Sequence, residues 1–252
     1  DEYLGRSIFR WTPSDKHETA FGFEYAHNEF GYPSPGYPAE GATSPRFPEG
    51  MPRWGTDTYS GLAEHQWRIL QRWTLFSSLR YDKHPYTEGL WSPRCALVFS
   101  PTDYDTIKLI YNHSVRRNFD EELRRDFENS AKPGDSESID GLELRYGRNI
   151  SDSWGVAVSS FLYDAELVVR SNQVFRHLQL GRYQIGGLEL ESVYVRPHYE
   201  LRFSHSFTKL LHAFLDDKTQ QTTVTGAVYG FGNDLANWST HLSKIRAAYL
   251  LN

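Results

Sequence analysis

The links between the amphipathic segments of this chain alternate in length. Segments of about ten residues are joined by short links at 13–17, 70–73, 101–105, 149–153 and 195–198. Between these come longer links at 31–57, 84–91, 115–137, 171–176 and 209–238. An antiparallel meander has two ends, so the alternation places tight turns at one end and long loops at the other. Such asymmetry is typical of an outer-membrane β-barrel, with short periplasmic turns and long extracellular loops.

Within the segments, apolar and polar residues alternate with the two-residue period of a β-strand. We expect eleven strands, at 3–12, 18–30, 58–69, 74–83, 92–100, 106–114, 138–148, 154–170, 177–195, 198–208 and 239–251. Several exceed the five or six residues usual in soluble proteins, which suits a tilted membrane crossing. The expected fold class is all-β: an antiparallel, up-and-down wall of a transmembrane β-barrel.

Alternation gives each strand an apolar face and a charged face. The apolar face includes Phe21, Phe23, Tyr199, Leu201 and Phe203. The opposite face includes Glu24, Glu64, Arg68, Arg80, Asp82, Lys108, Glu143, Arg145, Glu189, Glu191, Glu200, Arg202, Lys244 and Arg246. In a membrane barrel the apolar face meets lipid and the charged face lines a wet interior. A soluble sandwich would bury the apolar face, and alternation alone does not separate these arrangements.

Composition is compatible with both arrangements. Aromatic residues make up 15% of the chain, which suits the interfacial girdles of a barrel but also an aromatic-rich soluble sandwich or propeller. The mean hydropathy is −0.60, and no apolar run of about 18 residues predicts a transmembrane helix. A barrel strand needs apolar residues on one face only, so this hydropathy leaves the barrel interpretation in place.

Charge and motif content exclude several classes of function. The net charge of −5 argues against a nucleic-acid partner, which usually requires a basic stripe. The single cysteine, Cys95, cannot form an internal disulfide and lies in an apolar strand pattern. The ten histidines show no metal-ligand spacing, and neither a nucleophile elbow nor a P-loop occurs. We therefore expect no catalytic residues, no metal site and no cofactor.

The longest link, 31–57, is rich in proline and glycine and is punctuated by aromatic residues. Proline removes backbone donors and fixes φ, so this link is expected to be irregular. Aromatic and arginine side chains dominate binding hot spots, which makes Tyr37, Arg46 and Trp54 candidate ligand contacts. The alternative is that the loop packs on itself.

A second candidate contact lies in the link that follows the sixth strand. Residues 118–128 have Phe119, Leu123 and Phe127 at four-residue spacing, which predicts a helix. Arg116 and Arg117 precede it and, with Arg124 and Arg125, form a basic cluster suited to a carboxylate- or phosphate-bearing ligand. The alternatives are ion pairs with the nearby acidic residues Asp120, Glu121, Glu122 and Asp126, or contact with lipopolysaccharide phosphates.

Eleven is an odd number, whereas single-chain bacterial barrels have an even number of strands. The turn assignments place the two termini at opposite ends of the sheet. The sequence also begins Asp-Glu-Tyr, without an initiator methionine. We therefore expect residues 1–252 to be part of a larger barrel domain, whose missing strands pair the two edges.

Five stretches resemble TonB-dependent outer-membrane receptors, in the family's order. Residues 92–103 (SPRCALVFSPTD) resemble the pattern SPR-x-x-L-x-Y-x-P-x-D, and 106–119 resemble the LK-x-x-Y-x-x-(A/S)FR-x-PN stretch. The others are 132–144 (the KPE and YE-x-G region), 187–191 (GLE-x-E) and 237–241 (N-x-P-x-H). The departures are an arginine, not a proline, at 117 and Gly-Leu-Glu-Leu, not an aromatic-Glu pair, at 141–144.

The resemblance implies a 22-stranded barrel in the outer membrane of a Gram-negative cell, with a plug domain that this chain does not contain. It implies capture of a scarce nutrient such as a siderophore, cobalamin or glycan, and import driven by the TonB energy-coupling complex through the plug. The other expected partners are a small-molecule nutrient or metal chelate, membrane lipid and lipopolysaccharide. Two alternatives remain: an outer-membrane barrel protease or lipase, and a soluble carbohydrate-binding sandwich or propeller.

Overall fold

The computed structural model describes residues 1–31, 53–130, 132–133, 135–171, 176–215 and 239–249. The described residues form eleven strands and one helix. The elements are β1 Glu2–Ser14, β2 His17–Phe30, β3 Trp54–Leu70, β4 Trp73–Lys83, β5 Leu90–Phe99, β6 Asp105–Arg116, α1 Asp120–Ser130, β7 Glu137–Ser151, β8 Trp154–Ser171, β9 Arg176–Arg196, β10 Tyr199–Leu215 and β11 His241–Tyr249.

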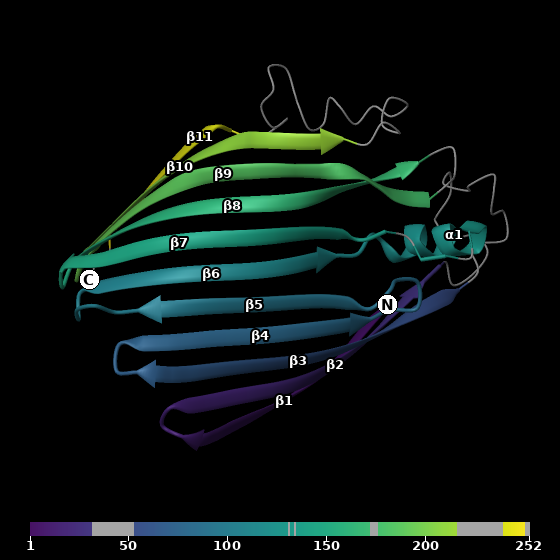
Figure 1. Cartoon of the computed structure of the whole chain (residues 1–252), viewed down its shortest axis with the longest axis horizontal. Coiled ribbons are helices and arrows are strands. Elements are labelled where there is room, and N and C mark those ends of the chain that lie inside the picture. The colour runs from purple at the N-terminus through teal and green to yellow at the C-terminus, as the bar shows by residue number, and fades with distance from the viewer. Residues whose placement is uncertain (32–52, 131, 134, 172–175, 216–238, 250–252) are drawn as a thin grey trace.

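The strands form one sheet in sequence order, and each strand pairs with the next in antiparallel fashion (Figure 1). Five tight links lie at one end of the sheet, here called the turn end. The β4–β5 link and α1 lie at the other end, here called the loop end (Figure 1). The predicted meander is confirmed, with an 11-stranded sheet that does not close between β1 and β11 in the described residues.

Most strands exceed their predicted bounds by a residue or two, and β3 and β10 extend furthest beyond them. β3 begins at Trp54 because that residue pairs with Phe30, so the strand enters the proline-rich link. β10 continues to Leu215 along β9, but a register shift between Leu210 and His212 interrupts its alternation. A bulge of this kind moves the following side chains to the other face, so a two-residue period cannot follow the strand through it.

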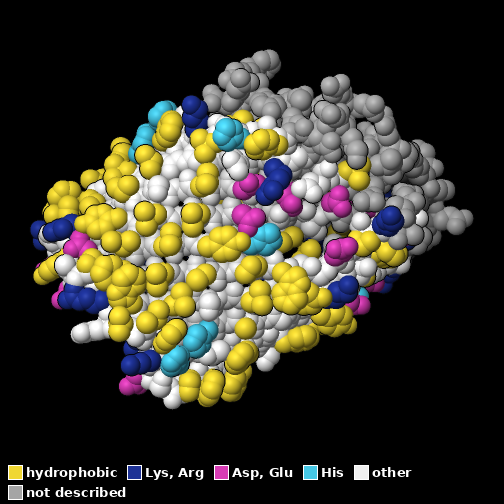
Figure 2. All heavy atoms as spheres, in the orientation of Figure 1, with side chains coloured by type: hydrophobic (Ala, Val, Ile, Leu, Met, Phe, Trp, Pro, Cys, Tyr) yellow, Lys and Arg dark blue, Asp and Glu magenta, His cyan; other side chains and the backbone are white. Residues whose placement is uncertain are grey.

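Directly opposed residues of paired strands project from the same face of a sheet. The register therefore defines an outer face, whose central positions include Phe21, Phe23, Gly61, Ala63, Leu75, Leu79, Leu97, Leu109, Leu142, Leu144, Val158, Leu162, Leu188, Leu190, Leu201, Phe203 and Ile245. None of these residues is charged, and the side chains of Phe21 and Phe23 are 48% and 53% exposed. Figure 2 shows hydrophobic side chains spread over the wall between two zones where charged ones gather.

The inner face carries the charged residues that the alternation predicted. Arg6 and Arg80 both bind the carboxylate of Glu24, and Arg80 also contacts Asp82 at 2.8 Å. Arg80 also donates to Ser60 Oγ of β3 at 3.0 Å, so this network links the first four strands across the inner face. Glu24 is only 8% exposed, and its two oxygens are held by the two guanidinium groups.

Glycines on the inner face are covered by rings from the neighbouring strand. Gly187 lies opposite Phe161, and a Cβ at position 187 would lie 2.5 Å from that ring and 2.2 Å from the carbonyl oxygen of Phe207. Gly141 lies opposite Tyr163 in the same way. The absence of a side chain at these positions lets an aromatic ring lie flat on the wall.

The predicted helix is confirmed, beginning two residues later than expected. Because α1 begins at Asp120, Phe119 precedes it and is 81% exposed, whereas Leu123 is fully buried. The three residues of the expected apolar stripe therefore do not share one buried face. Within the described residues, no helix combines the length and apolarity that a membrane crossing requires.

Candidate functional site at the loop end

α1 is attached to the inner rim of the wall through one buried carboxylate. Asp120 accepts hydrogen bonds from Thr56 Oγ1 at 2.7 Å and from Asn28 Nδ2 at 3.4 Å. Its other oxygen faces the Nε atom of Arg117 and the Nε2 atom of His84, each at 3.5 Å. Four segments of the chain thus meet at one side chain: β2, β3, the β4–β5 link and the start of α1.

Electrostatics keep this carboxylate ionised. Burial raises the pKa of the Asp120 carboxyl. The nearby imidazole of His84 and the hydrogen bond from Thr56, together with the charge of Arg117, outweigh burial and lower that pKa to about 2. Asp120 is also one of three acidic residues in the first turn of α1, where negative charge interacts favourably with the positive end of the helix dipole. The anchor is therefore charged at neutral pH.

His84 is oriented by its own link. The backbone amide of Tyr86 donates to its Nδ1 atom at 3.3 Å, so the ring carries its hydrogen on Nε2, toward Asp120. The imidazole is fully buried, and the ring of Tyr86 lies between it and Phe127 of α1, with centroids 5.8 and 5.5 Å away. The β4–β5 link therefore holds the helix from a second side.

The predicted contact residue Trp54 also belongs to this cluster. Its ring stacks on Phe30 with centroids 4.4 Å apart, and the guanidinium of Arg124 lies 4.8 Å from the Trp54 centroid. Such a cation–π contact between a strand and the helix restrains both partners. Trp54 is therefore a junction between the wall and α1.

The four arginines of the predicted basic cluster have different partners. Arg116 pairs with Glu137 at 2.5 Å and keeps its side chain 75% exposed, whereas Arg117 is drawn inward to donate to Thr58 Oγ1 at 2.8 Å. On the helix, Arg124 pairs with Glu128 and Arg125 with Glu121, each four residues apart. The four cations therefore do not form one patch, and Arg116 is the most accessible of them. The other two predicted contacts, Tyr37 and Arg46, lie outside the described residues.

Sequence reasoning did not single out His84, Asn28 or Thr56. Asp120 was placed only among possible ion-pair partners, although an acidic residue at a helix start is a recognisable signal. The other three carry no such signal, because a polar residue near the end of a strand occurs in most β-proteins. In the described residues, no cluster of three or more His, Cys, Asp or Glu side chains is arranged to hold a metal ion.

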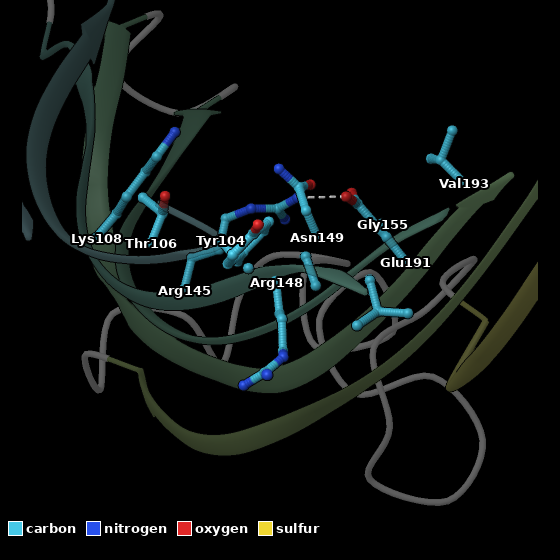
Figure 3. A pocket seen from close by; sticks show the side chains of 12 residues that line it. Tyr104, Thr106, Lys108, Arg145, Arg148, Asn149, Gly155, Glu191 and Val193 are labelled. Carbon is cyan, nitrogen blue, oxygen red and sulfur yellow. Dashed lines mark hydrogen bonds and ion pairs between the residues drawn. The ribbon is translucent and has the colours of Figure 1, made fainter. Parts of the chain in front are cut away.

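The inner wall below this cluster is hollowed. A cavity of about 340 Å³ near the turn end has a floor of small residues that includes Gly147, Gly155 and Ala157. Its rim carries Lys108 and Arg145, and Arg145 is paired with Glu191 (Figure 3). Larger hollows of about 440 and 740 Å³ lie over β1–β6 and β6–β11. The inner face thus offers polar, water-accessible concavities along its length.

Solved structures with the same fold are transporters or receptors by name. The FrpB iron transporter from Neisseria meningitidis (F5-1 variant, apoprotein form) has a TM-score of 0.63 and 14% identity, covering 86% of this chain and 37% of that one. The siderophore receptor PirA from Pseudomonas aeruginosa has a TM-score of 0.63 and 14% identity, with coverages of 82% and 40%.

The ferric-catecholate import receptor Fiu from Escherichia coli K12 has a TM-score of 0.69 and 13% identity, with coverages of 98% and 42%. The chain thus spans about two fifths of the length of these structures, and at such identity the likeness concerns the fold. No curated protein sequence matches the chain. A family model described as "TonB dependent receptor-like, beta-barrel" matches residues 3–252. The chain therefore belongs to the family of TonB-dependent receptor β-barrels.

Proposed function

We propose that this chain forms part of the wall of a Gram-negative outer-membrane receptor that captures a scarce nutrient and imports it with TonB-coupled energy. Its loop end would face the cell exterior and its turn end the periplasm. The family is an outer-membrane family of transporters, which favours transport over catalysis. The observation that carries the proposal is the division of the sheet into an apolar outer face and a charged, hollowed inner face.

The height of the apolar band supports a membrane location. On β6 the outer positions between Asp105 and His113 are all apolar or aromatic. Eight residues span about 26 Å along a strand, which becomes about 20 Å across a membrane at the usual tilt of about 40°. This is close to the band of about 25 Å that outer-membrane barrels expose to lipid.

The family and the loop-end chemistry both support one ligand class. Relatives of the same fold are named as iron, siderophore, ferric-catecholate and copper transporters. A metal chelate usually carries anionic oxygens, for which an exposed guanidinium is a suitable partner. Arg116 and the ring of Trp54 are the described candidates for ligand contact, together with Arg117 and with Tyr37 and Arg46 of the long loop. A siderophore-class chelate is therefore the first choice, before cobalamin or a glycan.

The test uses the complete receptor in cells that lack their own copy. Labelled ferric siderophores, cobalamin and glycans would be offered in turn, with and without a protonophore. TonB-coupled import predicts that the protonophore abolishes uptake but leaves surface binding intact. Uptake at an unchanged rate would contradict energy coupling, and hydrolysis of the offered compound by the purified receptor would favour an enzyme.

Matched variants then test the loop-end site. Arg116→Gln should weaken binding of an anionic chelate about tenfold, the loss of one charge-assisted hydrogen bond. Arg196→Gln, an exposed arginine at the turn end, should leave the affinity unchanged. Arg117 is unsuitable for this purpose because it also holds Thr58 and Asp120. Equal affinity of the receptor and its Arg116→Gln variant would remove Arg116 from the site.

A further inference from the structure

A compact polar cluster interrupts the apolar outer face near the loop end of β2 and β3. Tyr25 donates a hydrogen bond to the Oδ1 atom of Asp57 at 2.7 Å, and the Nδ1 atom of His27 contacts the same oxygen at 2.9 Å. Tyr25 and His27 lie two residues apart on β2, and Asp57 is directly opposite His27 on β3.

The same construction recurs four strands further along the sheet. On β6, Tyr111 and His113 lie two residues apart, and Asp140 is directly opposite His113 on β7. Both side chains contact Asp140 Oδ1, Tyr111 at 2.8 Å and His113 at 3.0 Å. The two Tyr–His–Asp clusters therefore have the same spacing of Tyr and His on one strand and the same position of Asp on the next strand. They also share the acceptor atom, and their distances are nearly equal.

The strand register places the two clusters at one height. The row of directly opposed residues that contains Tyr111 crosses to β2 through Cys95, Ser77, His65 and Thr19. Tyr25 lies six residues beyond Thr19, which is about 20 Å along the strand. The distance across the sheet from β6 to β2 is four interstrand spacings, or about 19 Å. The line between the clusters is therefore inclined by about 45° to the rows of opposed residues. Barrel strands tilt by 35–45°, and this line is therefore nearly level in a membrane.

Two outer-face tryptophans at the turn end, Trp73 and Trp154, define a line that slopes in the same direction. Trp73 on β4 shares its row with Val158 on β8, through Phe99, Ile107 and Tyr146. Trp154 lies four residues from Val158 toward the turn end, about 13 Å over about 19 Å, or an inclination of about 35°. The line through the tryptophans and the line through the clusters thus have similar slopes on opposite sides of the apolar band, which places the Tyr–His–Asp clusters at the loop-end border of that band.

This border carries polar atoms that a lipid headgroup could contact. In each cluster Nδ1 of the histidine faces the carboxylate, so Nε2 and the second carboxylate oxygen remain for an external partner. Side-chain exposures of 33% and 48% for His27 and Asp57, and of 27% and 39% for His113 and Asp140, leave these atoms accessible. Between the clusters, Lys83 on β4 is exposed and makes no ion pair with the described residues.

We propose that the two Tyr–His–Asp clusters and Lys83 form a binding strip for the phosphorylated sugar headgroup of lipopolysaccharide. The inference rests on the proposed outer-membrane location, with the loop end outside. Lys83 and the histidine rings would contact the phosphates, and the carboxylates would accept hydrogen bonds from sugar hydroxyls. A phospholipid headgroup offers a phosphate for Lys83 but few hydroxyls for the two carboxylates, which favours the glycolipid.

The test compares lipid-dependent stability of the complete receptor. The receptor, purified from native outer membranes, would be reconstituted in vesicles of phosphatidylethanolamine alone, with added lipopolysaccharide, or with added phosphatidylglycerol. The strip variant would combine His27→Phe, Lys83→Gln and His113→Phe. The control, His17→Phe, alters a partly exposed outer-face histidine at the turn end. Heat-modifiable migration first establishes that each protein is folded in the membrane.

We expect lipopolysaccharide to raise the melting temperature of the receptor and of the control, and the rise to be at least halved in the strip variant. Phosphatidylglycerol should not distinguish the three proteins. An equal rise in all three would overturn the strip, and the same loss with phosphatidylglycerol would reduce it to a general contact for anionic lipid. If the receptor imports no nutrient but lipopolysaccharide still raises its melting temperature, the result would contradict the transport proposal and leave the strip in place.

If the strip variant migrates as unfolded protein, Lys83→Gln alone would be measured. This side chain is exposed and without an ion pair among the described residues, so its replacement should not affect folding. It should reduce the amount of lipopolysaccharide that co-purifies with the receptor to about half or less. An unchanged amount would overturn the proposal.

Discussion

Asp120 of α1 accepts a hydrogen bond from Thr56 of β3 at 2.7 Å, and this bond joins the loop helix to the inner rim of the wall. Thr56 and the two inner-face residues that follow it on β3, Thr58 and Ser60, are all buried. The helix is therefore attached to a row of buried polar side chains on the inner rim. Its position is set by a carboxylate, whereas the strands below it are held by backbone pairing.

The charge on Asp120 makes attachment of α1 dependent on pH only in strong acid. The folded pKa of about 2 lies below the unfolded value of 3.8, so the charged carboxylate contributes about 2 kcal/mol above pH 4. That contribution is lost as the pH falls from about 4 to about 2. Pepsin cleavage around α1 should accelerate across this window. Asp120→Asn should be cleaved rapidly and at nearly the same rate throughout.

Glu121→Gln is the matched control, because Glu121 lies on the exposed side of the same helix. It should retain the acceleration seen with the native chain. If Asp120→Asn behaves like the native chain between pH 4 and pH 2, another group holds α1 in place.

Replacing Glu24 by glutamine should destabilise the wall by about 2 kcal/mol, since it removes the charge that Arg6 and Arg80 share. Glu64→Gln, on the same inner face but exposed, should change stability by less than about 0.5 kcal/mol. Urea unfolding of the complete receptor in detergent micelles measures both. Equal midpoints for the two variants would mean that solvent already screens the Glu24 pairs.

Gly187→Ala and Gly147→Ala make the same change at two inner-face positions. At Gly187 the new Cβ would lie 2.2 Å from the Phe207 carbonyl oxygen, whereas at Gly147 the nearest atom is 3.9 Å away. We expect Gly187→Ala to cost about 2 kcal/mol or more and Gly147→Ala to be nearly neutral. The fraction of heat-modifiable receptor and its urea midpoint are the measurements. Similar losses at both sites would contradict the covering of Gly187 by its neighbours.

Leu109 and Ile110 are adjacent on β6 but project from opposite faces. Leu109→Arg places a charge at the centre of the outer band and should cost about 2–4 kcal/mol in a bilayer. Ile110→Arg places it beside the 440 Å³ hollow of the inner face and should cost less. Folding equilibria in lipid vesicles compare the two. A larger cost for Ile110→Arg would reverse the assignment of the faces.

The strand pattern could be read from the sequence because it depends on neighbours one and two residues apart. All eleven strands occur in the expected order, and the side chains of Phe21 and Leu201 project from the outer face as expected. The bulge after Leu210 was not foreseen, since it breaks the period on which the prediction relied. The helix was foreseen from four-residue spacing, but not the exposure of Phe119.

The loop-end site was foreseen only in part, because its contacts join residues far apart in the chain. Asp120 lies 64 residues from Thr56 and 92 from Asn28. No local period connects such positions. Arg116 and Arg117 are neighbours in sequence, yet one faces Glu137 and the other is drawn toward Thr58.

The sequence by itself determined that the chain forms long alternating strands with tight links at one end and longer ones at the other, because side-chain alternation and turn chemistry act over a few residues. Only the tertiary structure decided which residues share a row, how α1 is anchored, and that the two Tyr–His–Asp clusters lie at one height. These depend on strand register and tilt, which are set by pairing across the whole sheet.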